Sequence, residues 1–412
     1  MYYKAGAFAV GLLVLIFCLN AFKAAGGAET STGIVVPLYT DPPSPAWDAV
    51  ISTKTQHPDV PMIVVINPND GPAPYDSKYV PAVAQLQSLG ITVLGYVRTG
   101  YSTVPFSNAT NEMSEYKDWY HVNGTLFDEM SYWHGNETYY SNLSNYSRSI
   151  GLGYTMGNPG IDTLPSYIGT VDNIVIYENT SLPVDSKLAG WHTSYNKDNF
   201  SLVAIQVDNL NKSYVQDVSN FVRYIYVTNY TLPNPYESIS PFLSNMSSFL
   251  PVSASLDVMA ESRSGSMIGG IPVQVFYNGQ GLLQGSMPSS FAVNQNQSYD
   301  VLVPASFKGY LFDHWQDDRS QIPARTVSMS SNVTLVAIYK QVLCMPPASG
   351  DWSITSSCIF GSNATAPGNV TVGNNSRVTI PSGMKFGIDL RHHHLIVRHG
   401  SGVHVKHGGS IN

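Results

Sequence analysis

Short apolar runs of β type follow one another from residue 33 to about residue 230, and most are separated by intervals of helical length. There are eight such runs: Ile34–Tyr39, Pro61–Asn67, Thr92–Val97, Gly124–Asp128, Gly153–Asn158, Asn173–Glu178, Leu202–Asp208 and Phe221–Thr228. The clearest intervening helix is Lys78–Leu89, with apolar residues at helical spacing and Gly90 as a fitting stop. Strands that alternate with helical crossovers predict a parallel sheet covered by helices. Eight units fit a (β/α)8 TIM-type barrel, and a doubly wound open sheet is the alternative.

The pattern changes after residue 250. Residues 251–340 consist of short alternating segments with Gly and Asn turns, such as Ile271–Tyr277 and Val333–Tyr339, which predict a small antiparallel β-sandwich. Residues 341–412 repeat still shorter β units, which fit either a β-solenoid or a second small sandwich. We therefore expect a barrel in residues 29–250, a β-sandwich in residues 251–340 and a β-rich module in residues 341–412, all preceded by a targeting segment in residues 1–28.

Polar residues stand at the carboxyl ends of five of the eight predicted barrel strands: Asn67, Asp128, Asn158, Glu178 and Asp208. The carboxyl ends of barrel strands meet on one face, where barrel enzymes place their catalytic residues. Burial of an ionised carboxylate is costly unless it is paired, so acids at the end of an apolar strand suggest a site. The alternative is an ordinary turn after a core strand.

Side-chain alternation predicts which of these residues face the barrel interior. If Asp128 points inward, so does Leu126, while Phe127 faces the helices. The same parity places Asn158 with Met156, and Glu178 with Ile174 and Ile176. Glu129 comes one position after the strand, where a turn would bring it to the rim.

Composition argues for an exported protein. Charged residues make up 12% of the chain and the formal net charge is −7, which gives no basic footprint for nucleic acid. Lys4, an apolar run from Ala5 to Phe22 and the small residues 24–28 resemble a secretory signal, which we expect to be cleaved, although the run is long enough to remain as a membrane anchor. Fifteen Asn-x-Ser/Thr acceptors, from Asn108 to Asn374, suit a glycosylated surface protein. We expect an extracellular or cell-surface location.

Two cysteines remain once the signal is removed, Cys344 and Cys358. We expect them to form a disulfide, because an oxidising compartment favours pairing. In the loop-entropy model a bridge of this span contributes about 3 kcal/mol.

Several motifs of the first 250 residues, in order, resemble the spherulin-4, or spherulation-specific, family, classed as glycoside hydrolase family 135. They are Ile34-Val-Val-Pro-Leu-Tyr39, Ile66-Asn-Pro-Asn-Asp-Gly-Pro72, Val93-Leu-Gly-Tyr-Val97, Leu126-Phe-Asp-Glu129, Tyr139-Tyr140, Asn158-Pro-Gly160 and Val175-Ile-Tyr-Glu178. The resemblance covers roughly residues 33–250. It implies a secreted (β/α)8 enzyme similar to an endo-α-1,4-galactosaminidase, whose polysaccharide substrate contains galactosamine. The family's acidic cluster maps onto Asp128, Glu129 and Glu178.

Glycoside hydrolysis needs two carboxyl groups on either side of the scissile bond. We predict Asp128 as the nucleophile and Glu178 as the general acid/base. Glu129 is a third candidate, which would take either role or orient the other two. No cofactor and no metal site are expected; the histidines at 392, 393, 394, 399, 404 and 407 invite a metal interpretation, but no nearby Cys completes a ligand set.

Further residues are candidates for binding the sugar. Amide and carboxylate groups would hold hydroxyls, and aromatic rings would stack on sugar faces. The full set of substrate-binding candidates is Tyr39, Asn67, Tyr96, Tyr101, Trp133, Asn158 and Asp208.

Two other interpretations of the function remain open. The chain fits a non-catalytic surface protein, an adhesin or envelope component, that uses the barrel to bind carbohydrate. It also fits a barrel hydrolase that acts on a different glycan. The sequence does not decide the oligomeric state.

Overall fold

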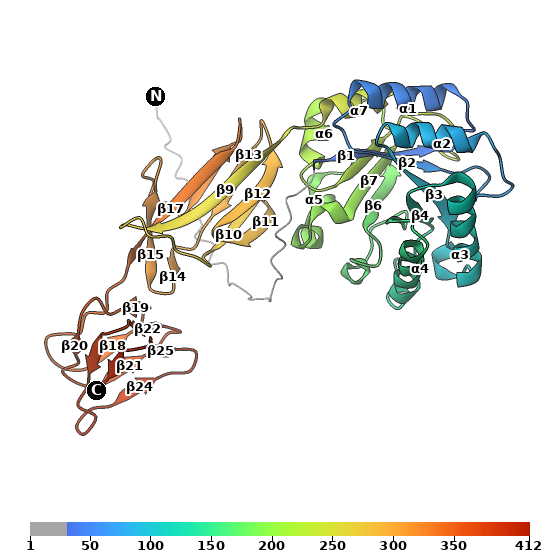
Figure 1. The fold of residues 1–412 in the computed structure, drawn as a ribbon. Helices are drawn as coiled ribbons and strands as arrows, with labels where there is room; N and C mark the ends of the chain where they lie inside the picture. Colours follow the sequence, from blue (N-terminus) through green and yellow to red (C-terminus); the bar gives the residue numbers. More distant parts are fainter. Residues whose placement is uncertain (1–30) are drawn as a thin grey trace, which may run out of the picture.

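The computed structural model describes residues 31–412, so the predicted signal or anchor in residues 1–28 lies outside the described residues. Eight parallel strands form a closed barrel in which β1 pairs with both β2 and β8 (Figure 1). The strands are β1 Gly33–Leu38, β2 Met62–Ile66, β3 Thr92–Arg98, β4 Gly124–Asp128, β5 Tyr154–Asn158, β6 Asn173–Thr180, β7 Phe200–Ile205 and β8 Tyr224–Val227. The predicted TIM-type barrel is confirmed, and closure excludes the open sheet.

Helices cover the outside of the barrel. They are α1 Pro45–Gln56, α2 Tyr79–Ser88, α3 Phe106–Glu115, α4 Glu137–Ser149, α5 Asp185–Leu188, α6 Lys212–Val218 and α7 Leu243–Phe249. The β5–β6 connection carries the short 3₁₀ helix Pro165–Tyr167 in the place of an α-helix. The strands are buried almost throughout, because one face meets the helices and the other fills the barrel.

One close contact fixes the chain next to β4. A Cβ on Gly157 of β5 would lie 2.1 Å from the sulfur of Met130, so only glycine lets this buried side chain pack against the strand. The Met130 N–H also donates to the Asn158 carbonyl (2.9 Å). The chain that leaves Asp128 is therefore held against β5.

Two sheets follow the barrel. One contains β11 Gln280–Ser286, β10 Pro272–Tyr277, β13 Ser298–Leu302 and β16 Ala324–Ser328; the other contains β12 Ser289–Asn294, β9 Ser253–Ser262, β17 Val333–Gln341, β15 Tyr310–Trp315 and β14 Ser306–Phe307. Their pairs are antiparallel except for β9–β17, which is parallel. The predicted antiparallel sandwich therefore contains one parallel pair, which the sequence pattern did not indicate.

The sandwich packs on the barrel beside α5 and α6 (Figure 1), through buried polar groups. Asn220, between α6 and β8, donates to the Gln297 side chain (2.8 Å) and accepts from the Tyr299 hydroxyl (2.7 Å). Asn220 stands at the amino-terminal end of β8, so this contact leaves the carboxyl ends of the barrel strands uncovered.

The last part of the chain forms three parallel sheets of three strands each. The strands are β18 Trp352–Ile354, β19 Cys358–Ile359, β20 Ala364–Thr365, β21 Val370–Val372, β22 Arg377–Ile380, β23 Lys385–Gly387, β24 Leu395–Val397, β25 Gly402–Val405 and β26 Ser410–Ile411. Each strand pairs with the one three positions later, which is the topology of a three-coil β-solenoid. The solenoid has its own apolar core, and Cys344 forms a disulfide with Cys358.

Candidate active site

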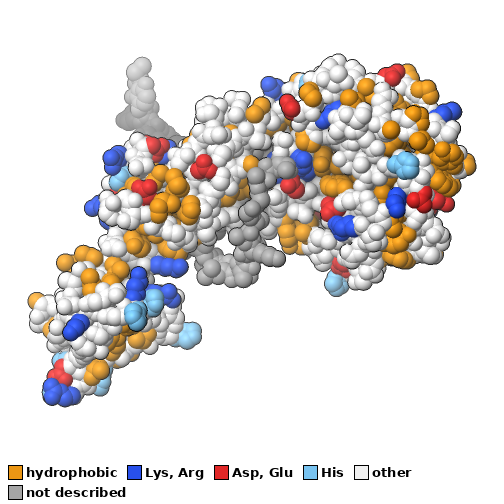
Figure 2. Space-filling model, viewed as in Figure 1, with side chains coloured by type: hydrophobic (Ala, Val, Ile, Leu, Met, Phe, Trp, Pro, Cys, Tyr) orange, Lys and Arg blue, Asp and Glu red, His pale blue; other side chains and the backbone are white. Residues whose placement is uncertain are grey.

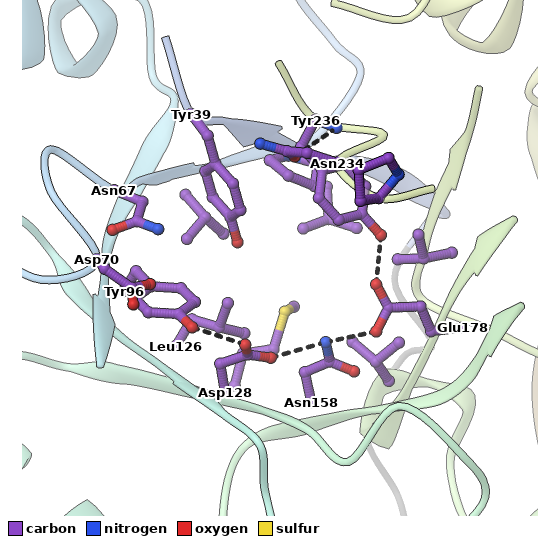
Figure 3. Close-up of a pocket in the computed structure, with 17 residues that line it drawn as sticks. Tyr39, Asn67, Asp70, Tyr96, Leu126, Asp128, Asn158, Glu178, Asn234 and Tyr236 are labelled. Carbon is purple, nitrogen blue, oxygen red and sulfur yellow. Dashed lines mark hydrogen bonds between the residues drawn. The ribbon is translucent and has the colours of Figure 1, made fainter. Parts of the chain in front are cut away.

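A cavity of about 340 Å³ opens at the carboxyl ends of the barrel strands (Figure 3). Strands β1 to β7, or the residues that directly follow them, line it together with the loop after β8. Its lining residues are Val35, Pro37, Tyr39, Val65, Asn67, Asp70, Tyr96, Leu126, Asp128, Met156, Asn158, Val175, Glu178, Val203, Pro233, Asn234 and Tyr236. The wall is aliphatic deeper in the barrel and polar near the strand ends.

Asp128 and Glu178 are joined by the side chain of Asn158, which lies between them (Figure 3). The Asn158 amide nitrogen donates to Asp128 Oδ1 (2.9 Å) and to Glu178 Oε2 (2.7 Å). The N–H of Gly160 donates to the Asn158 amide oxygen (3.1 Å), which fixes the amide with its NH₂ group toward the carboxylates. Because one nitrogen contacts both acids, the distance between Asp128 Oδ1 and Glu178 Oε2 cannot exceed the sum of the two hydrogen-bond lengths, 2.9 Å and 2.7 Å.

Each carboxylate also accepts a hydrogen bond from a tyrosine. The Tyr96 hydroxyl donates to Asp128 Oδ2 (2.8 Å), and the Tyr236 hydroxyl donates to Glu178 Oε1 in a short contact. All four carboxylate oxygens thus have a donor, and each acid is held in one orientation. Burial and the neighbouring carboxylates raise the pKa of both phenols above the usual range, so the hydroxyls remain protonated and donate.

Burial raises the pKa of Asp128 to about 6, against an ordinary value of 3.8. The negative charge of Glu178 acts in the same direction, while the hydrogen bonds from Tyr96 and Asn158 oppose it. Burial therefore favours the protonated form of Asp128 more than it would in an exposed aspartate.

A β-bulge in β6, and not simple side-chain alternation, directs Glu178 into the cavity. The β6–β7 register shifts between Val175 and Tyr177, which marks a β-bulge at Ile176. Val175, and not Ile174 or Ile176, lines the cavity with Glu178. The prediction that Glu178 shares its face with Ile174 and Ile176 was wrong, because the extra residue reverses the parity. The parity predicted for Asp128 with Leu126, and for Asn158 with Met156, is confirmed.

Glu129 does not join the carboxylate pair. Its backbone has a positive φ of 48°, and its side chain forms an ion pair with Arg98 (2.9 Å) that is partly exposed to solvent. Thr99 is not among the residues that line the cavity. Its hydroxyl donates to the carbonyls of Asp128 and Glu129, which stabilises this turn. Glu129 lies on the rim, outside the cavity lining.

The predicted sugar-binding residues divide between two places. Tyr39, Asn67, Tyr96 and Asn158 line the cavity, and the rings of Tyr39 and Tyr96 meet edge to face at 5.8 Å. Tyr101 and Trp133 lie outside the lining as neighbours with ring centroids 6.0 Å apart, and their side chains are 38% and 54% exposed.

Asp208 was predicted to converge with the other strand ends, and the structure places it elsewhere. Strand β7 ends at Ile205, and Gln206 turns the chain with a φ of 55°. Asp208 is exposed and is not among the lining residues. The predicted strand extended to Asp208, whereas β7 ends three residues earlier, and strand boundaries are the least certain feature of a sequence pattern.

The sequence pattern missed three residues of the cavity: Asp70, Asn234 and Tyr236. Asp70 stands in the loop after β2, with a φ of 55°. Asn234 and Tyr236 belong to the long β8–α7 loop, which has no periodicity to place its side chains. The signal available was the run Pro233-Asn234-Pro235-Tyr236 directly after the last strand, where barrel enzymes carry functional loops.

Comparison with known proteins agrees with this geometry. Residues 33–250 match the spherulation-specific family 4. The chain belongs to this family. Spherulin-4 from Physarum polycephalum is 32% identical over 162 residues, which are 38% of this chain and 48% of Spherulin-4. The chain thus matches about half the length of this curated family member.

The chain is also similar to solved structures. Aspergillus clavatus Sph3, solved in complex with GalNAc, is 26% identical, with a TM-score of 0.49 over 53% of this chain and 97% of Sph3. The endo-β-1,4-mannanase from Thermotoga petrophila is 9% identical, with a TM-score of 0.33 over 78% of this chain and 99% of the mannanase.

Two features are absent from residues 31–412. This part of the chain has no cluster of three or more His, Cys, Asp or Glu side chains placed to hold a metal ion. Within the same residues, no helix combines the length and apolar character needed to cross a bilayer.

Proposed function

We propose that the barrel is a glycoside hydrolase that cleaves an α-1,4-linked galactosamine-type polysaccharide with retention of configuration. The observation that carries the proposal is the shared amide of Asn158. Retaining enzymes hold their two carboxyl groups about 5–5.5 Å apart, whereas inverting enzymes leave about 6.5–9.5 Å for a water molecule. The two hydrogen bonds to Asn158 keep the facing oxygens of Asp128 and Glu178 closer together than the inverting arrangement requires.

In the proposed reaction, Asp128 is the nucleophile and Glu178 the general acid/base. The protonated Glu178 gives its proton to the glycosidic oxygen as the carboxylate of Asp128 attacks the anomeric carbon, which breaks the bond to the leaving sugar. Glu178 then takes a proton from a water molecule that attacks the same carbon and releases Asp128. Tyr96, Tyr236 and Asn158 are positioning residues that hold the two acids.

The charge of the cavity favours a cationic or neutral sugar over an acidic one. Asp70, Asp128 and Glu178 contribute carboxylates, and the lining contains no Lys, Arg or His. Such a cavity attracts a sugar that carries a free amine. The ligand of Sph3 is GalNAc, so the acetylated and the free amino sugar are both substrates to test.

Hydrolysis of α-1,4-linked galactosamine and N-acetylgalactosamine oligosaccharides, followed by mass spectrometry, tests this proposal. We expect the full chain to shorten at least one series, and Asp128→Asn and Glu178→Gln to abolish cleavage while remaining folded. Asp48→Asn removes an exposed carboxylate on α1 and is the matched control, with full activity expected. Saturable binding without cleavage would instead support a carbohydrate-binding surface protein. If the chain neither binds nor cleaves any glycan, both the hydrolase and the carbohydrate-binding proposals are overturned.

We also propose that the protein is exported. The Cys344–Cys358 disulfide and the exposed acceptor residues Asn108, Asn142 and Asn145 support this location. Fractionation of cells expressing the full chain, with intact-mass measurement of the product, tests both export and glycosylation. A reduced, unmodified protein in the cytoplasmic fraction would contradict it.

A further inference from the structure

The last coil of the β-solenoid differs in charge from the two coils before it. Residues 341–412 contain five Lys and Arg against two acidic residues, in a chain whose formal net charge is −7. All six histidines of this region lie between residues 392 and 407. Lys, Arg and His side chains gather on this module in Figure 2, where acidic side chains are scarce.

The positive charges stand at the corners between strands. The sequence repeats a basic residue followed by histidine at each of the three corners of the last coil: Arg391-His392 before β24, Arg398-His399 before β25 and Lys406-His407 before β26. These side chains are exposed. Because the coil has three sides, the pairs surround it.

Folding does not require charge at these corners. The five corners of the first two coils, at residues 355–357, 360–363, 366–369, 373–376 and 381–384, contain no charged residue and no histidine. The corner at Arg398 lies directly on one of them, with its N–H bonded to the Val372 carbonyl (2.9 Å). The corner at Lys406 lies on another, through the Gly383 N–H and the Gly408 carbonyl (3.1 Å). Neutral residues build the same turns.

Little in the module neutralises these charges. Asp389 contacts Arg391 (3.2 Å) and His392 (2.8 Å), and Asp351 lies near His393. Arg398 and Lys406 form no ion pair with any other residue of the described chain 31–412. Arg398 and Lys406 thus keep their charge exposed, and exposed cations attract a polymer of negative charge.

We propose that the last coil binds an acidic polysaccharide and so holds the barrel at a surface that carries such a polymer. The neutral corners of the other coils are the observation that carries this proposal. The site is independent of the cavity and of the reaction proposed there.

The experiment measures binding of the full chain to immobilised polygalacturonate and heparin, which present carboxylates and sulfates, with neutral dextran as the blank. We expect affinity for at least one acidic polymer, and added salt should weaken this binding. The double variant Arg398→Gln/Lys406→Gln should weaken binding roughly three- to tenfold. It leaves the Asp389 contacts intact, and its folding is checked by circular dichroism.

The matched control is Lys117→Gln/Lys187→Gln, which removes two exposed charges from the barrel. We expect it to bind like the original protein. The proposal is overturned if the barrel control loses as much affinity as the solenoid variant or if salt does not change the affinity. Tighter binding to double-stranded DNA than to both polysaccharides would also overturn it.

Discussion

Replacement of Asn158 by leucine tests the role of the shared amide. Leucine has a similar size but donates no hydrogen bond, so Asp128 and Glu178 each lose a donor that favours the ionised form. The pKa of Asp128, already about 6, should therefore rise further. A hydrogen bond to a charged group contributes about 1.5–3 kcal/mol, and one unit of pKa corresponds to about 1.4 kcal/mol. Since water enters the open cavity, we expect a rise of about one unit.

The assay is the pH dependence of kcat/KM. As the nucleophile, Asp128 must be ionised, so activity falls as the pH drops through about 6 in the original protein and through about 7 in Asn158→Leu. The control Asn67→Leu also changes an amide of the cavity, but one whose oxygen accepts from the Gly71 N–H (3.0 Å) and which has no bond to either acid. Its acid limb should stay in place. An unchanged acid limb in Asn158→Leu would refute the reasoning, and activity that falls as the pH rises through 6 would reverse the roles of the two acids.

Three further predictions concern single contacts. Tyr236→Phe removes the donor to Glu178, and we expect kcat/KM to fall roughly ten- to hundredfold with an unchanged melting temperature. Asp128→Asn should stabilise the folded protein by about 1–3 kcal/mol at pH 7.5, since the buried carboxylate favours its protonated form; urea unfolding should show the gain vanishing below about pH 4, where the acid is protonated in both states. Replacing Cys344 and Cys358 by serine should destabilise the solenoid by about 3 kcal/mol in calorimetry and leave barrel activity intact, because the solenoid core is separate.

The barrel could be predicted from the sequence because its signal is repeated and local. Each strand is a short apolar run, and its end is marked by residues that a buried strand does not tolerate, as at Asp128 and Asn158. Alternation then places Leu126 and Asp128 on one face without any knowledge of the partners. The solenoid was harder to separate from a sandwich, because strands of two to four residues do not reveal whether their neighbours run parallel.

The finer parts of the site depend on features that a pattern does not contain. The bulge at Ile176 changes which residues of β6 face the cavity, and it is visible only in the pairing with β7. Tyr236 comes from a loop whose path is set by tertiary contacts, and Glu129 leaves the site because its backbone turns to a positive φ beside Arg98. The sequence pattern indicated that Asp128 and Glu178 lie at strand ends, whereas their hydrogen-bond partners required the structure.

The configuration of the first-formed product tests the central claim most directly. Proton NMR in the first minutes of hydrolysis of an α-1,4-linked galactosamine oligosaccharide distinguishes the two anomers before they interconvert. The close pair of Asp128 and Glu178, held by Asn158, predicts that the α anomer appears first and that Glu178→Gln gives no product. A β anomer at the earliest time points would mean that water attacks directly, and would contradict the proposed pairing of these two carboxylates.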